Sequence, residues 1–290
     1  MTGERALEVL APGPLCLVQD LGRPGLAAIG VGRSGAADRG AFRLGARLLA
    51  QDYRCAALEV TLGGLEVRAR GDLVLALTGA PAPATLDGHG VGPDGPFLLP
   101  DGAVLRLWRP PVGLRTYLSV RGGVAVPAVL GSRSRDVLAG LGPDPLVAGD
   151  VLPVGAAPVA FPNVDVAPEP ELTSGTVLLH GTPGPRLDWL ADPTRLPATA
   201  WTVSTQSDRV GLRLEGTPLA RAADRRDAEL PSEGVVRGAV QVPADGQPVL
   251  FLADHPVTGG YPVLAVVVTA DLALAAQLRP GDGVRFRAVG

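Results

Sequence analysis

The sequence predicts a mainly β fold in two lobes, with a few short helices. Glycine and proline supply 39 and 29 of the 290 residues, a density that divides the chain into many short elements. Between these breaks, apolar residues alternate with polar ones at the period of a strand. Asp-Val-Leu at 136–138 precedes Gly-Asp at 149–150, and Asp-Leu-Ala at 271–273 precedes Gly-Asp at 281–282. Both halves are therefore expected to finish with a short helix, a turn and a last strand.

The first lobe is expected over residues 1–157. A strand at 6–10 precedes two glycine-rich loops, at 18–25 and 30–38. These loops are interpreted either as tight turns held by bonds between Asp and Arg side chains or as a functional surface. Asp38 is a good N-cap with apolar residues at helical spacing behind it, which predicts the clearest helix at about 39–50. Strands at 58–62, 65–69, 73–78, 104–108 and 116–120 then predict a closed or nearly closed β-domain.

Residues 158–172 are rich in proline and alanine and lack periodicity, so they are expected to form a linker. The second lobe, 173–290, begins with a strand at 176–179. Alternation in residues 209–215 predicts a half-buried strand with Arg209 and Arg213 on one face. An apolar run at 249–253 predicts a buried strand that ends at Asp254 and His255.

This part of the second lobe carries the candidate site. Gly211 has no Cβ, so a carboxylate could approach the backbone between Arg209 and Arg213 and be bound by their guanidinium groups. Asp254 or His255 is assigned to proton transfer, and Gly259 and Gly260 to oxyanion stabilisation. The further residues assigned to substrate binding are Gln206, Glu233, Gln241, Thr258 and Tyr261. A solvated arginine face, a plain glycine turn and a structural histidine are the alternative interpretations.

All 26 basic residues are arginine, because the chain contains no lysine. This absence excludes a Walker A phosphate loop, a Schiff base, a biotinyl-lysine and a Ser-Ser-Lys amidase triad within the chain. If ATP or biotin takes part in the chemistry, another chain must supply much of the machinery.

Charge and hydropathy exclude several further classes. The net charge is −3, and no basic stripe is interleaved with aromatics, so nucleic-acid binding is not expected. The first residues show no apolar signal core and no long apolar run follows, so we expect a cytoplasmic protein without a membrane span. Cys16 and Cys55 are expected to be reduced structural thiols. The three histidines form no metal-ligand pattern, so no metal site is expected, and no Gly-x-Ser-x-Gly motif indicates a stand-alone hydrolase.

A series of short motifs resembles the biotin-dependent carboxyltransferase family in content and order. They are Gln-Asp-Leu-Gly-Arg at 19–23, Ser-Gly-Ala-Ala-Asp at 34–38, Ala-Leu-Glu at 57–59, Thr-Gly-Ala at 78–80, Tyr-Leu-Ser-Val-Arg-Gly-Gly at 117–123, Leu-Gly-Ser-Arg-Ser at 130–134, Ser-Asp-Arg-Val-Gly at 207–211, Ser-Glu-Gly at 232–234 and Thr-Gly-Gly-Tyr-Pro at 258–262. The resemblance covers nearly the whole chain. It implies a fold of two β-barrel lobes related to cyclophilin.

The resemblance also implies partners and a reaction. Members of the family include the C subunit of 5-oxoprolinase and the protein labelled allophanate hydrolase subunit 2. The first implication is a subunit of an ATP-dependent 5-oxoprolinase, which opens 5-oxoproline to glutamate and is inactive as an isolated chain. Its expected partners are a second carboxyltransferase-like subunit, resembling the 5-oxoprolinase B subunit or the kinase A inhibitor, and a third, lactam-utilisation subunit. ATP is then a cofactor of the complex.

Two alternatives stay open at this point. One is a non-catalytic antagonist that binds a kinase-inhibitor partner. The other is a urea-type carboxyltransferase that uses biotin carried by another chain. The family often has Gln-Thr where this chain has Pro256-Val257, and the helix that follows Asp38 usually ends in Ala-Asn-x-Leu-Val-Gly-Asn, unlike residues 46–51. The first departure removes a polar contact from the proposed site and so bears on the substrate.

Overall fold

Strands dominate the chain, and the predicted mainly β class is confirmed. The computed structural model describes residues 5–92, 95–161, 167, 172 and 174–289. Contacts between Cα atoms divide the chain into two units: unit 1 contains residues 1–23, 34–136 and 140–173, and unit 2 contains residues 24–33, 137–139 and 174–290. Two short segments of the N-terminal half therefore belong to the second unit. Most of the predicted linker at 158–172 lies outside the described residues.

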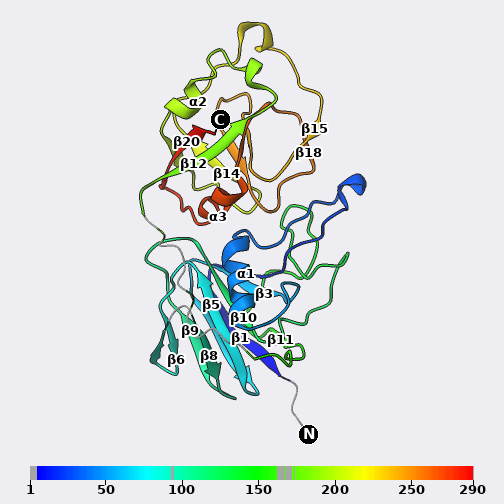
Figure 1. Ribbon diagram of the computed structural model, residues 1–290, viewed down its shortest axis with the longest axis vertical. Helices are drawn as coiled ribbons and strands as arrows, with labels where there is room; N and C mark the ends of the chain where they lie inside the picture. The colour runs from blue at the N-terminus through cyan, green and yellow to red at the C-terminus, as the bar shows by residue number, and fades with distance from the viewer. Residues whose placement is uncertain (1–4, 93–94, 162–166, 168–171, 173, 290) are drawn as a thin grey trace. The chain divides into compact units, whose positions relative to one another are not determined.

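Unit 1 holds one helix and the first strands of the chain (Figure 1). The elements are β1 (Ala6–Pro12), β2 (Leu15–Gln19), α1 (Arg39–Leu48), β3 (Ala57–Thr61), β4 (Leu65–Arg70), β5 (Leu73–Gly79), β6 (Ala84–Leu86), β7 (His89–Val91), β8 (Pro96–Leu99), β9 (Val104–Leu107), β10 (Arg115–Val120) and β11 (Val151–Pro153). The strands predicted at 6–10, 58–62, 65–69, 73–78, 104–108 and 116–120 are all present, with ends that differ by one or two residues.

The strands of unit 1 form two sheets. One has the order β11-β1-β4-β9-β6-β7 and the other the order β2-β3-β10-β5-β8. Leu7 and Val67 of the first sheet and Leu58, Leu75 and Leu118 of the second belong to one buried cluster, so the sheets share a core. The closed or nearly closed β-domain expected for this lobe is found as two sheets and not as one closed barrel of its described strands. Isolated bridges from Val124 to Ala56 and to Val154 link the end of β3 in one sheet with the end of β11 in the other.

Helix α1 begins where the sequence predicts and ends at Leu48, two residues early. The side chain of Asp38 accepts a hydrogen bond from the Ala41 N–H at 3.0 Å, which caps the first turn. At Gly45 a Cβ would collide with the side chain of Ser119 on β10. Glycine at this position therefore lets the helix lie directly on the sheet.

Buried polar side chains hold the parts of the two glycine-rich loops that belong to unit 1. The carboxylate of Asp20 accepts hydrogen bonds from the hydroxyls of Ser132 at 2.6 Å and Ser134 at 2.5 Å, and from the Arg133 N–H at 2.7 Å. In the second loop, the Tyr117 hydroxyl donates to Glu59 at 2.7 Å and accepts from the Asp38 N–H at 2.8 Å. The expected bonds between Asp and Arg side chains are thus replaced, for Asp20, by serine hydroxyls and a backbone amide.

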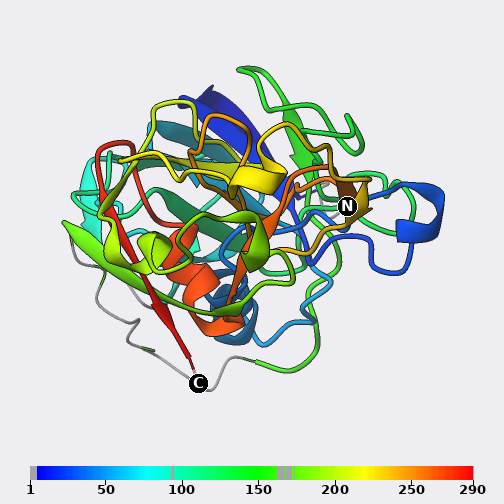
Figure 2. The same ribbon diagram turned by 90° about the horizontal axis from the view of Figure 1, so that it is seen from above.

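Unit 2 contains a seven-stranded closed barrel in the order β12-β19-β16-β17-β14-β13-β20. Its elements are η1 (Ala27–Ile29), β12 (Thr176–Pro183), η2 (Leu187–Trp189), α2 (Arg195–Ala198), β13 (Trp201–Val203), β14 (Gly211–Glu215), η3 (Ala223–Arg225), β15 (Glu233–Gly234), β16 (Ala239–Gln241), β17 (Val249–Phe251), β18 (Thr258–Gly259), β19 (Val263–Val267), η4 (Thr269–Asp271), α3 (Leu272–Ala275) and β20 (Gly283–Ala288). The barrel closes where β12 pairs in parallel with β20, drawn in green and red in Figure 2. Trp201, Leu250 and Val284 fill its interior.

The repeated plan of the two halves is present in part. Gly149 and Gly281 both have positive φ, at 96° and 92°, and each stands in the turn before a last strand, β11 or β20. The short helix predicted in both halves is found only as α3, because residues 137–140 form a turn bounded by a bridge between Asp136 and Leu141. Among the described residues, no helix is long and apolar enough to cross a bilayer.

Candidate functional site

Arg209 and Asp254 form a buried ion pair in unit 2. The Arg209 Nε donates to Asp254 Oδ2 at 2.9 Å and its Nη2 donates to Oδ1 at 3.1 Å. Asp254 Oδ2 also accepts the backbone N–H of Val137 at 3.0 Å, and the Asp254 N–H donates to the Arg209 carbonyl at 3.0 Å. Both side chains are almost inaccessible to solvent, at 3% for Arg209 and 0% for Asp254. The pair therefore holds together three stretches of chain that are distant in sequence.

Arg213 does not join this pair, so the expectation that both arginines share one face is wrong. Asp208 explains the difference: its Oδ1 accepts the N–H groups of Val210 at 2.8 Å and Gly211 at 3.1 Å. Residues before Gly211 therefore form a turn, and β14 begins only at Gly211. Arg213 lies on the exposed side of that strand, whereas Arg209 lies before it and is buried.

The residues predicted at 233 and 258–261 are brought together by a small two-stranded ladder. β15 pairs antiparallel with β18, so that Glu233 lies opposite Gly259 and Gly234 opposite Thr258. Thr258 is exposed, while Gly259 and Gly260 are half-buried. Beneath the ladder, Val235 packs in a small apolar cluster with Phe251 and Val263. The cluster fixes this two-stranded ladder to the rest of unit 2.

Gln241 supports the same ladder from β16. Its side chain is buried and its Nε2 donates to the carbonyl of Tyr261 at 2.9 Å. A Cβ added at Gly259 would come within 2.6 Å of this Nε2 atom. Glycine at 259 is thus needed for the Gln241 amide to reach Tyr261. Tyr261 is 47% exposed, so its side chain is open to a ligand.

His255 follows Asp254 and is partly exposed. Its Nδ1 lies 2.8 Å from the carbonyl oxygen of Pro256. Because a carbonyl can only accept, Nδ1 carries the proton, and Nε2 of the neutral ring is then the basic nitrogen. The imidazole also lies near the Phe251 ring, with centroids 6.3 Å apart. His255 is therefore better exposed for proton transfer than Asp254, whose carboxylate is enclosed.

Arg186 is a member of this cluster that the sequence did not single out as a site residue. Its guanidinium forms a two-point ion pair with Glu233, with Nε to Oε2 at 3.1 Å and a second contact from Nη2 to Oε1. This hydrogen-bonded pairing lowers the pKa of the Glu233 carboxyl and raises the pKa of Arg186. The signal that could have found it is an arginine directly after the Pro-Gly-Pro turn at 183–185.

The structure thus gathers Glu233, Gln241, Gly259 and Tyr261 with Arg186, and separately pairs Arg209 with Asp254. Gln206 is exposed in the turn before Arg209. A carboxylate, an arginine, an amide, a hydroxyl and an imidazole are the groups that recognise a small polar substrate and move its protons. In the part of the chain that the structure describes, no group of three His, Cys, Asp or Glu side chains gathers to hold a metal ion.

A family model described as "Carboxyltransferase domain, subdomain A and B" matches residues 29–288, which is most of the chain. The chain belongs to this carboxyltransferase family. It is 37% identical to the 5-oxoprolinase C subunit of Escherichia coli strain K12 over 285 residues, which cover 97% of this chain and 90% of the relative. It is 32% identical to the 5-oxoprolinase C subunit of Haemophilus influenzae, with 98% and 91% covered.

The chain also resembles a part of a larger enzyme. The crystal structure of the Kluyveromyces lactis urea amidolyase superposes with a TM-score of 0.91 at 31% identity. The match covers 98% of this chain but only 19% of the urea amidolyase chain. The carboxyltransferase fold is therefore shared over the whole chain, whereas most of the larger enzyme has no counterpart in it.

Proposed function

We propose that this carboxyltransferase-family chain is the C subunit of an ATP-dependent 5-oxoprolinase, which converts 5-oxoproline, ATP and water to glutamate, ADP and phosphate. The observation that carries the proposal is the extent of the match. Relatives named as the C subunit of 5-oxoprolinase align with nearly all of this chain and are themselves covered to 90% and 91%. A urea amidolyase, in contrast, is matched over a small fraction of its length. The match therefore favours the function of the 5-oxoprolinase C subunit over that of the urea amidolyase.

The substrate of this reaction is a small carboxylate with a lactam ring, and the site residues fit its parts. Arg213, exposed on β14, binds the carboxylate, and Arg209 positions the loop through Asp254. Nε2 of His255, the residue that directly follows Asp254 in the sequence, transfers the proton. The N–H groups of Gly259 and Gly260 face the oxyanion that forms as the ring opens. Polar contacts to the ring come from Gln206, Glu233, Thr258 and Tyr261, and Gln241 holds Tyr261 in place through its carbonyl.

ATP enters at the level of the assembly. A chain without lysine has no Walker A lysine with which to hold the β- and γ-phosphates. The proposal therefore assigns much of the phosphate chemistry to the partners: a second carboxyltransferase-like subunit, resembling the 5-oxoprolinase B subunit or the kinase A inhibitor, and a third, lactam-utilisation subunit. The proposal assigns the ATP-using assembly to the cytoplasm, and the isolated chain is expected to be inactive.

Reconstitution tests the proposal. The chain is co-expressed with the two partner subunits, and glutamate formation from 5-oxoproline is followed with and without ATP. Substitution Arg213→Ala is expected to raise the KM for 5-oxoproline by about 10- to 100-fold, the loss of a charge-assisted contact. Arg285→Ala, which removes another exposed strand arginine of the same unit, is the matched control and leaves KM unchanged. Tight assembly without ATP-dependent glutamate formation would instead favour the non-catalytic antagonist.

A urea-type carboxyltransferase is the second candidate, because the superposition on the urea amidolyase extends over the whole chain with a TM-score of 0.91. In that case biotin must be carried by another protein, since this chain has no lysine to bear it. The two candidates are separated by adding a biotinylated carrier protein and avidin. Consumption of urea that requires the biotinylated carrier and is abolished by avidin favours carboxyl transfer. Formation of glutamate from 5-oxoproline that is unaffected by the carrier and by avidin favours 5-oxoproline hydrolysis.

A further inference from the structure

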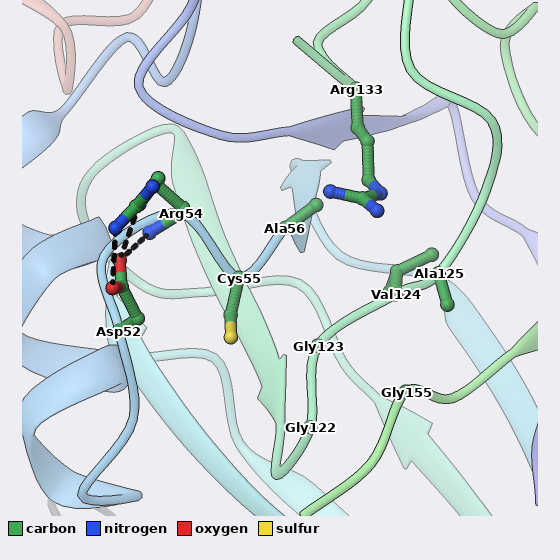
Figure 3. A pocket seen from close by; sticks show the side chains of 10 residues that line it. All are labelled: Asp52, Arg54, Cys55, Ala56, Gly122, Gly123, Val124, Ala125, Arg133 and Gly155. Carbon is green, nitrogen blue, oxygen red and sulfur yellow. Dashed lines mark hydrogen bonds and ion pairs between the residues drawn. The ribbon is translucent and has the colours of Figure 1, made fainter. Parts of the chain in front are cut away.

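A pocket in unit 1 is separate from the residues discussed above. It has a volume of about 350 Å³, within the size range of small-molecule sites. Its wall is made by residues 52, 54–56, 122–125, 133 and 155, all of which belong to unit 1 (Figure 3). None of these residues is used by the proposed 5-oxoprolinase site.

The backbone and Nε of Arg133 are held by hydrogen bonds, whereas its terminal guanidinium nitrogens face the pocket. Arg133 lies between Ser132 and Ser134, whose hydroxyls point inward to the buried carboxylate of Asp20. The Arg133 N–H donates to the same carboxylate, and its Nε donates to the Val126 carbonyl at 2.8 Å. Its Nη1 and Nη2 have no hydrogen-bond partner within the described part of the chain. Figure 3 shows the side chain reaching from its own loop toward Ala56.

The remaining charges of the wall cancel. Arg54 is paired with Asp52, with Nε to Oδ1 and Nη2 to Oδ2 both at 3.3 Å. Burial and the nearby Asp52 carboxylate raise the pKa of the Cys55 thiol, although Arg133 acts in the opposite direction. The thiol is therefore neutral near pH 7 and does not compensate Arg133. The wall carries one net positive charge, which suits a monoanion.

The floor of the pocket offers apolar surface and few other donors. The N–H groups of Val124, Ala125 and Gly155 are already bonded to the carbonyls of Ala56, Pro153 and Gly123, respectively. The N–H of Gly122 is bonded to the Gln51 side chain at 2.8 Å. The pocket therefore presents small side chains and a guanidinium tip, and its polar recognition depends on Arg133.

We propose that this pocket binds a compact organic monocarboxylate, with its carboxylate on Nη1 and Nη2 of Arg133 and its apolar body on Ala56, Val124 and Ala125. A planar carboxylate matches the two terminal guanidinium nitrogens, and the apolar floor selects against a hydrated inorganic anion. The site is independent of the proposed 5-oxoprolinase reaction, because its test requires neither partner subunits nor ATP.

Cys55 in the pocket wall can report on binding through its rate of alkylation. Cys55 lines the cavity and is partly exposed, whereas Cys16, the other cysteine, is fully buried. The rate of Cys55 alkylation by N-ethylmaleimide is measured on the full chain at mildly alkaline pH, with isobutyrate as probe. Isobutyramide, of the same shape without the charge, and inorganic phosphate are the controls. Saturating isobutyrate is expected to slow alkylation at least about fivefold, and the controls are expected to leave the rate within about a factor of two.

Variants separate the guanidinium from other causes of protection. Arg133→Gln is expected to raise the isobutyrate concentration for half-protection at least about tenfold, and Arg43→Gln, at an exposed arginine of α1 outside the wall, is the matched control with little effect. Ala125→Leu fills the pocket without touching the Asp20 bonds, and it is expected to abolish protection even if Arg133→Gln fails to fold. Equal protection by isobutyrate and isobutyramide would overturn the proposal. Protection that survives both Arg133→Gln and Ala125→Leu would overturn it as well.

Discussion

The guanidinium of Arg209 is paired at two points with the carboxylate of Asp254, with N–O distances of 2.9 and 3.1 Å and both side chains excluded from solvent. A buried ion pair of this kind is costly to break, because removal of one partner leaves the other charged and desolvated. The pair also receives the Val137 N–H, so it joins residues 137, 209 and 254 of unit 2. Its contribution to the fold can be measured apart from catalysis.

Substitution Asp254→Asn is expected to destabilise the protein by about 3–5 kcal/mol, because Arg209 is then a buried charge without its counter-ion. Urea denaturation of the single chain measures this loss. The double substitution Arg209→Met with Asp254→Leu is expected to recover most of it, since an apolar pair removes both charges together. A loss below about 1 kcal/mol for Asp254→Asn would contradict the burial described for the pair.

Substitution Gly259→Ala is expected to destabilise the protein by about 1–3 kcal/mol, because the new methyl group displaces the Gln241 amide from the Tyr261 carbonyl. Gly234, in the partner strand of the same ladder, has nothing within 4 Å of an added Cβ, so Gly234→Ala is a matched control. Thermal unfolding of both variants makes the comparison. Equal losses at the two glycines would refute the close contact at 259.

The Arg186–Glu233 pair predicts a pH dependence. Because Arg186 lowers the folded-state pKa of Glu233 below its ordinary value of 4.5, the pair stabilises the protein above that value. This stabilisation is lost as the pH falls through the lowered pKa. Substitution Arg186→Ala should therefore flatten the decline in stability below about pH 4.5, and a ¹³C NMR titration should show the Glu233 pKa moving up. An unchanged Glu233 titration would exclude the pair in solution.

Substitution Tyr117→Phe is expected to cost about 1–3 kcal/mol, because the Asp38 N–H and the Glu59 carboxylate each lose a buried hydrogen-bond partner. Burial and the charge of Glu59 raise the pKa of Tyr117, so its hydroxyl keeps the proton that it donates. Tyr53→Phe removes a hydroxyl from a residue that is 42% exposed and is the control. Guanidinium chloride unfolding of the two variants makes the comparison, and Tyr117→Phe is expected to have the lower midpoint. Equal midpoints for the two variants would contradict the buried hydrogen bonds of the Tyr117 hydroxyl.

The local sequence patterns predicted most strands of unit 1 and the resemblance to the family. They did not predict which side chains of the candidate site contact one another. Strands between turn residues were found from period-2 alternation, and α1 from the Asp38 cap, because these signals depend on neighbours in sequence. The same alternation was wrong at Arg209, where the side chain of Asp208 forms a turn that interrupts the strand. An Asx turn depends on one side-chain bond, which periodicity does not detect.

Contacts that span the sequence were also beyond prediction. The pairing of Arg186 with Glu233 joins residues 47 positions apart, and that of Asp20 with Ser134 joins residues 114 apart. Nothing in the composition near Asp20 indicates that serines of a distant motif satisfy its carboxylate. The motifs at 19–23 and 130–134 could be recognised as belonging to the family, but only the structure shows that they bind one another.

The second unit is assembled from three separate pieces of the chain, residues 24–33, 137–139 and 174–290. On the ribosome, the first two pieces emerge long before the barrel that they join, so this unit matures only after residues 174–290 have been synthesised. Expression of residues 174–290 alone would omit the Val137 amide that bonds to Asp254. Such a fragment would therefore lack part of the unit that it is meant to represent. For the same reason, exchange of one continuous gene segment between relatives would combine the barrel of one protein with residues 24–33 and 137–139 of another.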